Sequence, residues 1–214
     1  MAKHYPLMPS CTDAVARKRW EGSAEFLTTN DYDKLISRDA IGTLDGETKF
    51  VFLKGVYDGA AEFYRAAAAL PYSKSKRGAG QDLLFGTYYD PRNGPLGWTS
   101  DTRNNPEFLE TKLMPLLVWM GAALGQLQLG PSGFSTVTVN RSALFTPHRD
   151  KKNKGLACMM AFGEFVGGDL CFPRLRVAFR LRPGDLLIAD TANEYHGTVG
   201  GIWDDRISVV AYLR

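Results

Sequence analysis

The chain has 214 residues, with 26 Lys and Arg against 23 Asp and Glu and a formal charge of +3. This length suits one compact domain with a sizeable core, so we expect residues 1–214 to form a single domain. So small a charge does not identify a nucleic-acid-binding protein by itself, and no apolar run approaches the roughly 20 residues of a membrane span, so we expect no membrane association.

The part of the chain up to about residue 130 is expected to supply most of the helices. An apolar run over 49–56 precedes a helix over 60–70, where apolar side chains recur at helical spacing. Residues 82–90 have the pattern of a strand, and 91–105, rich in Gly, Pro and Asn, has that of a long exposed loop.

A second helix is predicted to begin at Pro106. Asn105 and Pro106 stand in the favoured order of cap and first helical residue, and leucines follow along one face as far as Leu127. This face is expected to pack on the core, and Pro115 to kink the helix.

From Gly133 onward the pattern changes to short strands separated by Gly-Gly and Arg-Pro-Gly-Asp turns. The expected strands are 134–144, 155–162, 169–172, 176–181, 185–190, 195–199 and 206–213. Such a series is typical of a jelly-roll sandwich or barrel, whose open mouth is a usual place for a small-molecule site. We therefore expect an α+β protein with a jelly-roll core over about 133–214, buttressed by helices from about 1–130.

Two of the three histidines lie in this strand-rich part. His148 and Asp150 are two residues apart, so on an extended strand their side chains would project from one face and share a metal ion. With His196 they supply two imidazoles and one carboxylate, the facial ligand set of non-haem Fe(II) oxygenases, which leaves positions open for a co-substrate and O2. Each residue alone has an ordinary structural explanation, but the combination favours an iron site.

Arg206 follows His196 by ten residues and shares a strand face with Ser208. A guanidinium can hold a carboxylate through two parallel hydrogen bonds, and a serine hydroxyl can donate another. These residues are therefore predicted to bind the far carboxylate of 2-oxoglutarate, whose keto acid would chelate the iron.

The order H-x-D, distal His and Arg resembles that of the 2-oxoglutarate oxygenases, which share a double-stranded β-helix fold. The resemblance spans about residues 133–214 and includes the segments 165–170, 183–187 and 206–210. It implies an Fe(II)- and 2-oxoglutarate-dependent dioxygenase that consumes O2 and hydroxylates a C–H bond. Asn140 is expected to contact the co-substrate, as strand asparagines do in some related oxygenases.

More narrowly, the run 148–153 together with Gly167-Gly168-Asp169-Leu170 resembles the Tet/JBP branch, especially its compact fungal members. This implies oxidation of the methyl group of a modified base in DNA, from 5-methylcytosine to 5-hydroxymethylcytosine and, by repeated rounds, further. The partner would be DNA whose target base is flipped out of the duplex.

Several residues are candidates for contacts with such a substrate. Basic side chains suited to phosphates lie in the glycine-rich loop and beside the metal motif, an aromatic side chain could stack on the base, and a carboxylate could accept from the amine of cytosine. The basic residues are Lys76, Arg77, Arg149 and Lys151, the aromatic residue is Tyr195, and the carboxylate is that of Asp190.

Two other classes of function stay open. A protein or small-molecule hydroxylase on the same fold would use the basic mouth for an acidic substrate, and a binding module would keep the fold without turnover. Three cysteines without zinc-like or C-x-x-C spacing favour a reducing intracellular compartment, and the basic clusters at 17–19 and 74–77 favour the nucleus.

Overall fold

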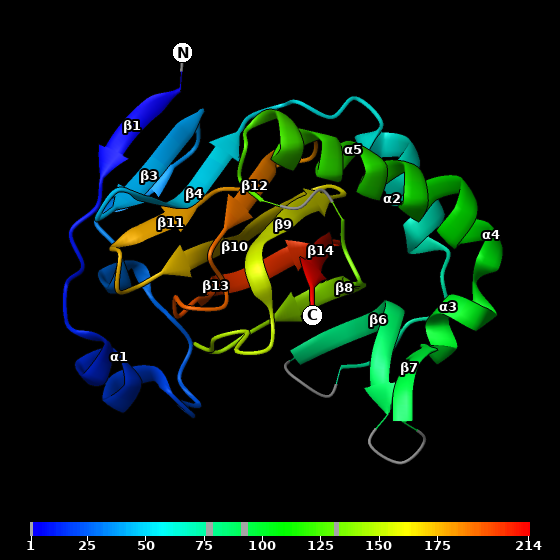
Figure 1. Cartoon of the computed structure of the whole chain (residues 1–214), viewed down its shortest axis with the longest axis horizontal. Helices are drawn as coiled ribbons and strands as arrows, with labels where there is room; N and C mark the ends of the chain where they lie inside the picture. The colour runs from blue at the N-terminus through cyan, green and yellow to red at the C-terminus, as the bar shows by residue number, and fades with distance from the viewer. Residues whose placement is uncertain (1, 76–78, 91–93, 131–132) are drawn as a thin grey trace.

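A computed structural model describes residues 2–75, 79–90, 94–130 and 133–214. These residues form an α+β protein with two mixed sheets (Figure 1). The helices are α1 (Asp13–Trp20), α2 (Ala60–Ala68), α3 (Ser100–Asn104), α4 (Pro106–Phe108) and α5 (Met114–Gln126), with a short 3-10 turn at Thr29–Asp31 and a π-helical turn at Leu109–Leu113.

The large sheet takes its strands from most of the length of the chain. In spatial order these strands are β1 (Lys3–Pro6), β3 (Ala40–Leu44), β4 (Glu47–Leu53), β12 (Leu186–Ala189), β9 (Lys154–Phe162), β14 (Ile207–Leu213), β8 (Thr136–Leu144), β6 (Ala79–Asp90) and β5 (Ser73–Lys74), with β7 (Gly94–Trp98) paired to β6. The small sheet has the order β13 (Gly197–Asp204), β10 (Phe165–Phe172), β11 (Val177–Phe179) and β2 (Lys34–Ile36). Only β1 with β3 and β11 with β2 pair in parallel among these strands.

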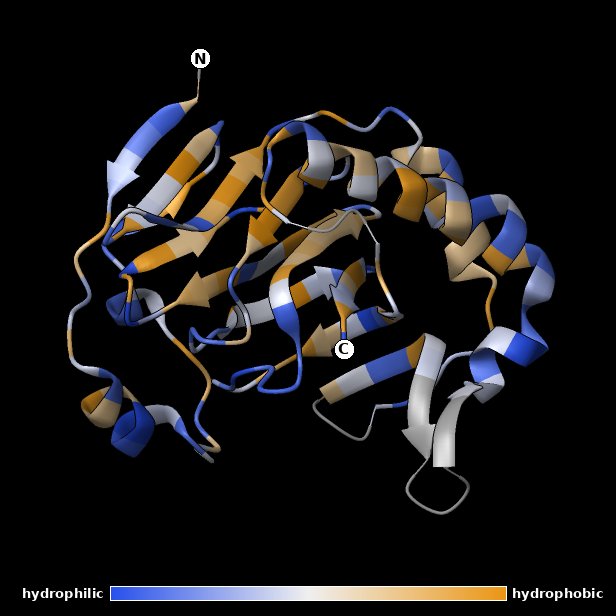
Figure 2. Ribbon diagram, in the orientation of Figure 1, coloured by the Kyte–Doolittle hydropathy of each residue, from blue (hydrophilic) through white to orange (hydrophobic). Residues whose placement is uncertain are grey.

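Side chains of the central strands alternate between two cores, because successive residues of a strand point to opposite faces. In β9, Cys158 and Met160 belong to the core beneath α2 and α5, whereas Met159 and Ala161 belong to the core that faces the small sheet. The strongly hydrophobic colouring of β4 and β12 agrees with burial on both faces (Figure 2). The helix α2 and the helical stretch that ends in α5 therefore buttress one side of the large sheet, whereas α1 packs against residues of the small sheet.

The helical stretch from Pro106 to Gln126 packs against this core and contains an irregular turn. Proline cannot donate a main-chain hydrogen bond to the residue four positions earlier, and a π-helical turn over Leu109–Leu113 lies directly before Met114 and Pro115. By length and composition this stretch could cross a membrane, contrary to the expectation that no such run is present. Its buried residues Leu113, Leu116, Met120 and Leu124 instead lie in the core against α2 and the sheet.

One sequence-based expectation about the first 130 residues was wrong. Much of 91–105 is ordered secondary structure rather than a long loop, since β7 pairs with β6 and α3 follows it. The same part of the chain also supplies strands to both sheets, including β1 and β3 at one edge. Short strands of this kind gain stability from their neighbours rather than from their own pattern, which explains why they were missed.

Candidate iron and 2-oxoglutarate site

Both candidate histidines lie at one point where two segments of main chain meet. His148 lies in the connection between β8 and β9, between the two strands predicted at 134–144 and 155–162, and His196 directly precedes β13. The two residues form an isolated antiparallel bridge, in which the N–H of His148 donates to the carbonyl of His196 at 3.0 Å and the N–H of His196 donates back at 2.9 Å. Pairing of the two main chains therefore brings the two imidazoles close together.

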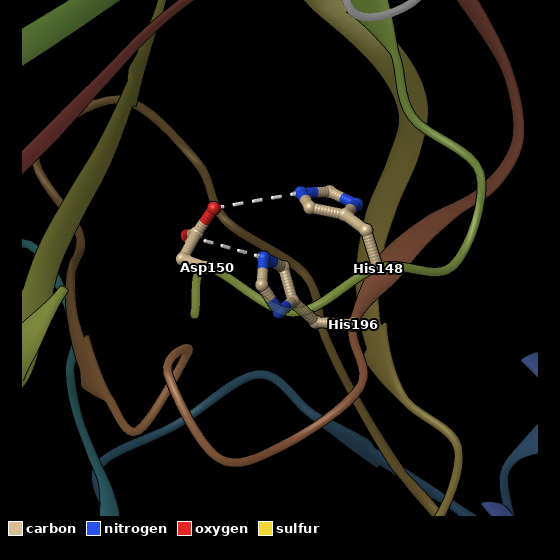
Figure 3. Close-up of side chains that lie close together, drawn as sticks. All are labelled: His148, Asp150 and His196. Atoms are coloured by element: carbon tan, nitrogen blue, oxygen red, sulfur yellow. Dashed lines mark ion pairs between the residues drawn. The ribbon is translucent and has the colours of Figure 1, made fainter. Parts of the chain in front are cut away.

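Asp150 completes the cluster from the same connection. Its carboxylate oxygens lie 3.9 Å from Nε2 of His148 and 3.6 Å from Nε2 of His196 (Figure 3). The main-chain N–H of Asp150 donates to the carbonyl of Thr191 at 2.9 Å, which ties the carboxylate-bearing segment to the loop before His196. One ligand atom from each of the three residues lies within 4.8 Å of the others, so they can converge on one metal ion.

The imidazoles are oriented for metal binding by hydrogen bonds at their other nitrogen. Nδ1 of His148 lies 2.8 Å from the carbonyl of Thr146, and Nδ1 of His196 lies 3.1 Å from the carbonyl of Glu194. A carbonyl accepts from Nδ1–H, which leaves Nε2 as the unprotonated ligand nitrogen. Burial, and secondly the neighbouring His148, lowers the pKa of His196 to about 4, so this ring is neutral at physiological pH.

Arg206 lies just before β14 with its side chain buried. The residue is 8% exposed, and its Nε has no hydrogen-bond partner among the described residues. Burial lowers the pKa of Arg206 to about 10, while the charge of Asp169 acts in the opposite direction. An uncompensated buried guanidinium is costly unless an anion satisfies it. These features fit a carboxylate group of a bound ligand.

Asn140 and Ser208 lie beside Arg206 and directly opposite each other on β8 and β14. Nδ2 of Asn140 lies 3.4 Å from Oγ of Ser208, and Oδ1 of Asn140 is buried without a hydrogen-bond partner. The unsatisfied amide oxygen and the unsatisfied guanidinium nitrogen both belong to residues of one cavity. This is the chemistry expected where a polar ligand supplies the missing hydrogen bonds.

One cavity of about 500 Å³ joins the metal cluster to Arg206 between the two sheets. Its wall combines polar side chains around the iron ligands and Arg206 with an apolar part that includes Met160, and with further polar side chains. The remaining lining side chains include Thr138, Phe145, Lys152, Asn153, Met159, Leu170, Leu181, Thr198, Val210 and Tyr212. The volume lies within the range of about 300–1,000 Å³ that is typical of small-molecule sites.

Three residues that were predicted to contact the substrate interact with Asp13 in α1 or with Glu21, the residue after this helix. Arg149 donates to Asp13 at 3.1 Å and its guanidinium lies 4.7 Å from the ring centre of Tyr195. Lys151 pairs with Glu21, which also accepts from the hydroxyl of Tyr195 at 3.2 Å. Arg149 and Lys151 still line the cavity, but Tyr195 is 2% exposed and is not among its described lining residues.

Asp190 is also occupied by protein groups. Its carboxylate accepts from the main chain and amide of Asn193 at 3.1 and 2.9 Å and pairs with Lys49 at 3.2 Å, and it is not part of the described cavity wall. Contacts of Asp190 with a base therefore stay a prediction. Lys76 and Arg77 lie outside the described residues.

Some cavity residues were not predicted from the sequence. Asn153 lines the mouth and its buried Nδ2 has no hydrogen-bond partner, and Phe145 contacts the ring of His148 at 5.7 Å between centres. Their closeness in sequence to His148 and Asp150 is the only signal that could have marked them. Thr138 and Tyr212 could be recognised only after the pairing of β8 with β14 was known.

Comparison with known proteins agrees with this geometry. Residues 118–214 match the Tet/JBP family model, described as the oxygenase domain of the 2OGFeDO superfamily. A bifunctional helicase and thymine dioxygenase JBP2 from Leishmania infantum is 37% identical over 60% of this chain and 12% of its own length. The JBP2 of Leishmania major is 29% identical over 89% of this chain and 21% of its own length, so the chain spans only a small part of these relatives.

Solved structures support the fold. NgTET1, solved in complex with 5mC DNA, has a TM-score of 0.67 at 14% sequence identity. The superposition covers 100% of this chain and 82% of the NgTET1 chain. An oxidoreductase of the 2OG-Fe(II) oxygenase family from Burkholderia pseudomallei has a TM-score of 0.54 at 14% identity, over 99% of this chain and 95% of its own. With this family match, the His148, Asp150 and His196 cluster identifies residues 118–214 as an oxygenase domain of the Tet/JBP branch of the Fe(II)- and 2-oxoglutarate-dependent dioxygenases, a class that uses Fe(II), 2-oxoglutarate and O2.

Proposed function

We propose that this enzyme oxidises the C5-methyl group of a pyrimidine base in DNA, with 5-methylcytosine as the substrate and 5-hydroxymethylcytosine as the first product. The observation that carries the proposal is the continuity of the cavity, which joins the iron ligands to a buried Arg206 whose Nε has no hydrogen-bond partner among the described residues, and which also opens beside a basic segment. Such a cavity has room for a small dicarboxylate and a flipped base together. The named relatives, thymine dioxygenases and a protein solved with 5mC DNA, support the same substrate class.

The chain's own residues would orient both reactants. Arg206 would hold the far carboxylate of 2-oxoglutarate through paired hydrogen bonds, with Ser208 donating one more and Asn140 using its free amide oxygen for a neighbouring donor or an ordered water. The iron would be held by Nε2 of His148, a carboxylate oxygen of Asp150 and Nε2 of His196. The apolar wall around Met159, Leu170 and Val210 would keep bulk water away from the reacting atoms.

The bound iron supplies the activation of O2 and the removal of hydrogen from the methyl group. The overall step is balanced: one oxygen atom of O2 enters the new hydroxyl group, and the other enters succinate as 2-oxoglutarate loses carbon dioxide. Further rounds on the same carbon would give the formyl and carboxyl bases. The double-stranded β-helix fold of the superfamily would be formed by the facing parts of the two sheets.

The mouth of the cavity offers positive charge for the DNA backbone. Lys152 lines the cavity without an ion-pair partner among the described residues, and Lys154 is exposed at the start of β9. Arg149 and Lys151, although paired with α1 and Glu21, lie on the same segment. Phosphate contacts of this kind supply affinity without reading sequence and weaken as the salt concentration rises.

The test is anaerobic loading with Fe(II) and 2-oxoglutarate, followed by air and duplex DNA. One duplex would contain 5-methylcytosine and a matched one only unmodified bases, and nucleosides and succinate would be measured by mass spectrometry. Hydroxymethylcytosine above the level of an Asp150→Ala control is expected. Hydroxymethyluracil from both duplexes would identify thymine as the substrate, a second candidate favoured by the JBP2 relatives. Succinate without a base product would instead favour a protein or small-molecule hydroxylase.

A further inference from the structure

A buried ion pair lies directly behind the iron ligand His196. Glu194 is 1% exposed, and both of its carboxylate oxygens accept from Arg174, with Nε of Arg174 at 2.8 Å from Oε2 and its Nη2 bonded to Oε1. Arg174 lies in the turn between β10 and β11, and its own side chain is 15% exposed. The pair therefore fastens the segment before His196 to the small sheet.

The main chain of Glu194 forms the other half of this connection. Its carbonyl accepts from Nδ1 of His196 at 3.1 Å, and its N–H donates to the carbonyl of Asp190 at 3.1 Å. The rotation of the His196 ring about its side-chain bonds thus depends on where the Glu194 carbonyl points. The pairing of the Glu194 side chain with Arg174 constrains that direction together with the hydrogen bond from the Glu194 N–H to Asp190.

A gain in folding stability does not explain why Arg174 and Glu194 form a buried ion pair. Moving two charges out of water is costly, and a well-packed apolar pair of the same volume often gives equal or greater stability. Phe172 stacks on His196 with ring centres 5.6 Å apart, so apolar packing is available at this place in the fold. The bidentate geometry, however, fixes position and direction in a way that apolar packing does not.

We propose that Arg174 and Glu194 are a positioning pair, which holds the imidazole of His196 in the orientation required for iron binding. Neither side chain contacts the metal. The pair acts through the Glu194 carbonyl, and partners of this kind change metal affinity by about 10–100-fold when they are altered. The inference rests on the iron site of the family and not on the identity of the substrate.

A matched control lies two residues along the same turn. Arg176 pairs with both carboxylate oxygens of Asp33, at 3.1 Å from Nε to Oδ2 and 2.5 Å from Nη2 to Oδ1, but this pair is more exposed and neither residue contacts an iron ligand. Asp33→Asn therefore removes the same kind of interaction from the same turn without changing the support of His196.

The experiment compares Glu194→Gln, Arg174→Lys and Asp33→Asn with the parent enzyme, without DNA or turnover. Co(II) and Mn(II) binding would be measured anaerobically by calorimetry, the Co(II) absorption spectrum would report ligand geometry, and thermal unfolding of the metal-free proteins would report stability. We expect Glu194→Gln and Arg174→Lys to weaken metal binding by about 10-fold or more with an altered Co(II) spectrum. Asp33→Asn is expected to change neither.

A fourth variant separates positioning from stability. Replacing both partners with apolar residues, Arg174→Met with Glu194→Leu, should restore much of the thermal stability lost in the single variants but not the metal affinity. Metal affinity that follows thermal stability across all variants would overturn the proposal, as would parental affinity in Glu194→Gln. Because no base or DNA enters the test, a negative result would leave the proposed substrate unaffected.

Discussion

The guanidinium of Arg206 lies against the main chain of Gly168, so closely that a Cβ atom added to Gly168 would stand 2.9 Å from Nη1 of Arg206 and 2.7 Å from Cγ1 of Ile202. Gly168 also has a φ of +66°, a conformation that other residues rarely adopt. The Gly-Gly pair of β10 thus leaves the space in which Arg206 lies.

Gly168→Ala should therefore weaken the binding of 2-oxoglutarate, because the new methyl group displaces the guanidinium. Gly200→Ala is the matched control, since Gly200 has a φ of +68° but no atom within 4 Å of its added Cβ. Both variants should lose roughly 1 kcal/mol of stability through backbone strain. Only Gly168→Ala should raise the KM for 2-oxoglutarate, by about 10-fold; equal effects of the two variants would contradict this role.

Arg206→Ala should remove the charge that receives the co-substrate. Loss of one partner from a buried, hydrogen-bonded charge pair costs roughly 2–5 kcal/mol, so the affinity for 2-oxoglutarate should fall about 30-fold or more. The control is Arg182→Ala, because Arg182 contacts the same Phe165 ring at 5.6 Å but does not line the described cavity. Equilibrium binding of 2-oxoglutarate to the Mn(II) protein measures both; unchanged affinity in Arg206→Ala would exclude the clamp.

Metal ions should stabilise the folded protein through His148, Asp150 and His196. A ligand that binds only the folded state at about 100 times its Kd adds about 2.7 kcal/mol, which calorimetry detects as a higher Tm. Asp150→Ala should abolish this increase, whereas Asp204→Asn, at the exposed end of β13, should keep it. A metal-dependent rise in Tm that survives in Asp150→Ala would place the metal elsewhere.

Tyr195 should behave as a structural residue rather than as a platform for the base. Its ring packs against Trp20 at 5.9 Å between centres, and its hydroxyl donates to Glu21. Tyr195→Phe should cost about 0.5–1.5 kcal/mol of stability through loss of this hydrogen bond, with the KM for DNA unchanged. Denaturant unfolding and steady-state kinetics measure the two effects, and a raised KM at parental stability would restore the base-stacking role.

The sequence was most informative where one residue type is required by chemistry. His148, Asp150, His196 and Arg206 could be identified because metal ligation and carboxylate binding demand those side chains, and the described structure brings them to one cavity. Strands 134–144 and 155–162 were also predicted within two residues, since both bury alternating side chains on two sides.

The sequence was least informative where a side chain has several available partners. Substrate contacts of Arg149, Lys151 and Tyr195 stay a prediction, but the sequence did not show that Asp13 of α1 and Glu21 pair with these side chains. Such pairings join residues more than a hundred positions apart and depend on how the N-terminal segment crosses the small sheet. No local pattern in the sequence contains that information.

The main-chain bridge between His148 and His196 also bears on which metal the enzyme acquires. The bridge sets the separation of the two main chains, and hydrogen bonds from Nδ1 to carbonyl oxygens orient both imidazoles, so the two ring nitrogens are presented together to any ion that binds. A site of two nitrogens and one oxygen then follows the usual affinity order, in which cobalt, nickel and copper bind more tightly than iron. The ligand set therefore does not by itself favour iron over these ions, so the supply of free metal in the compartment contributes to which ion is bound.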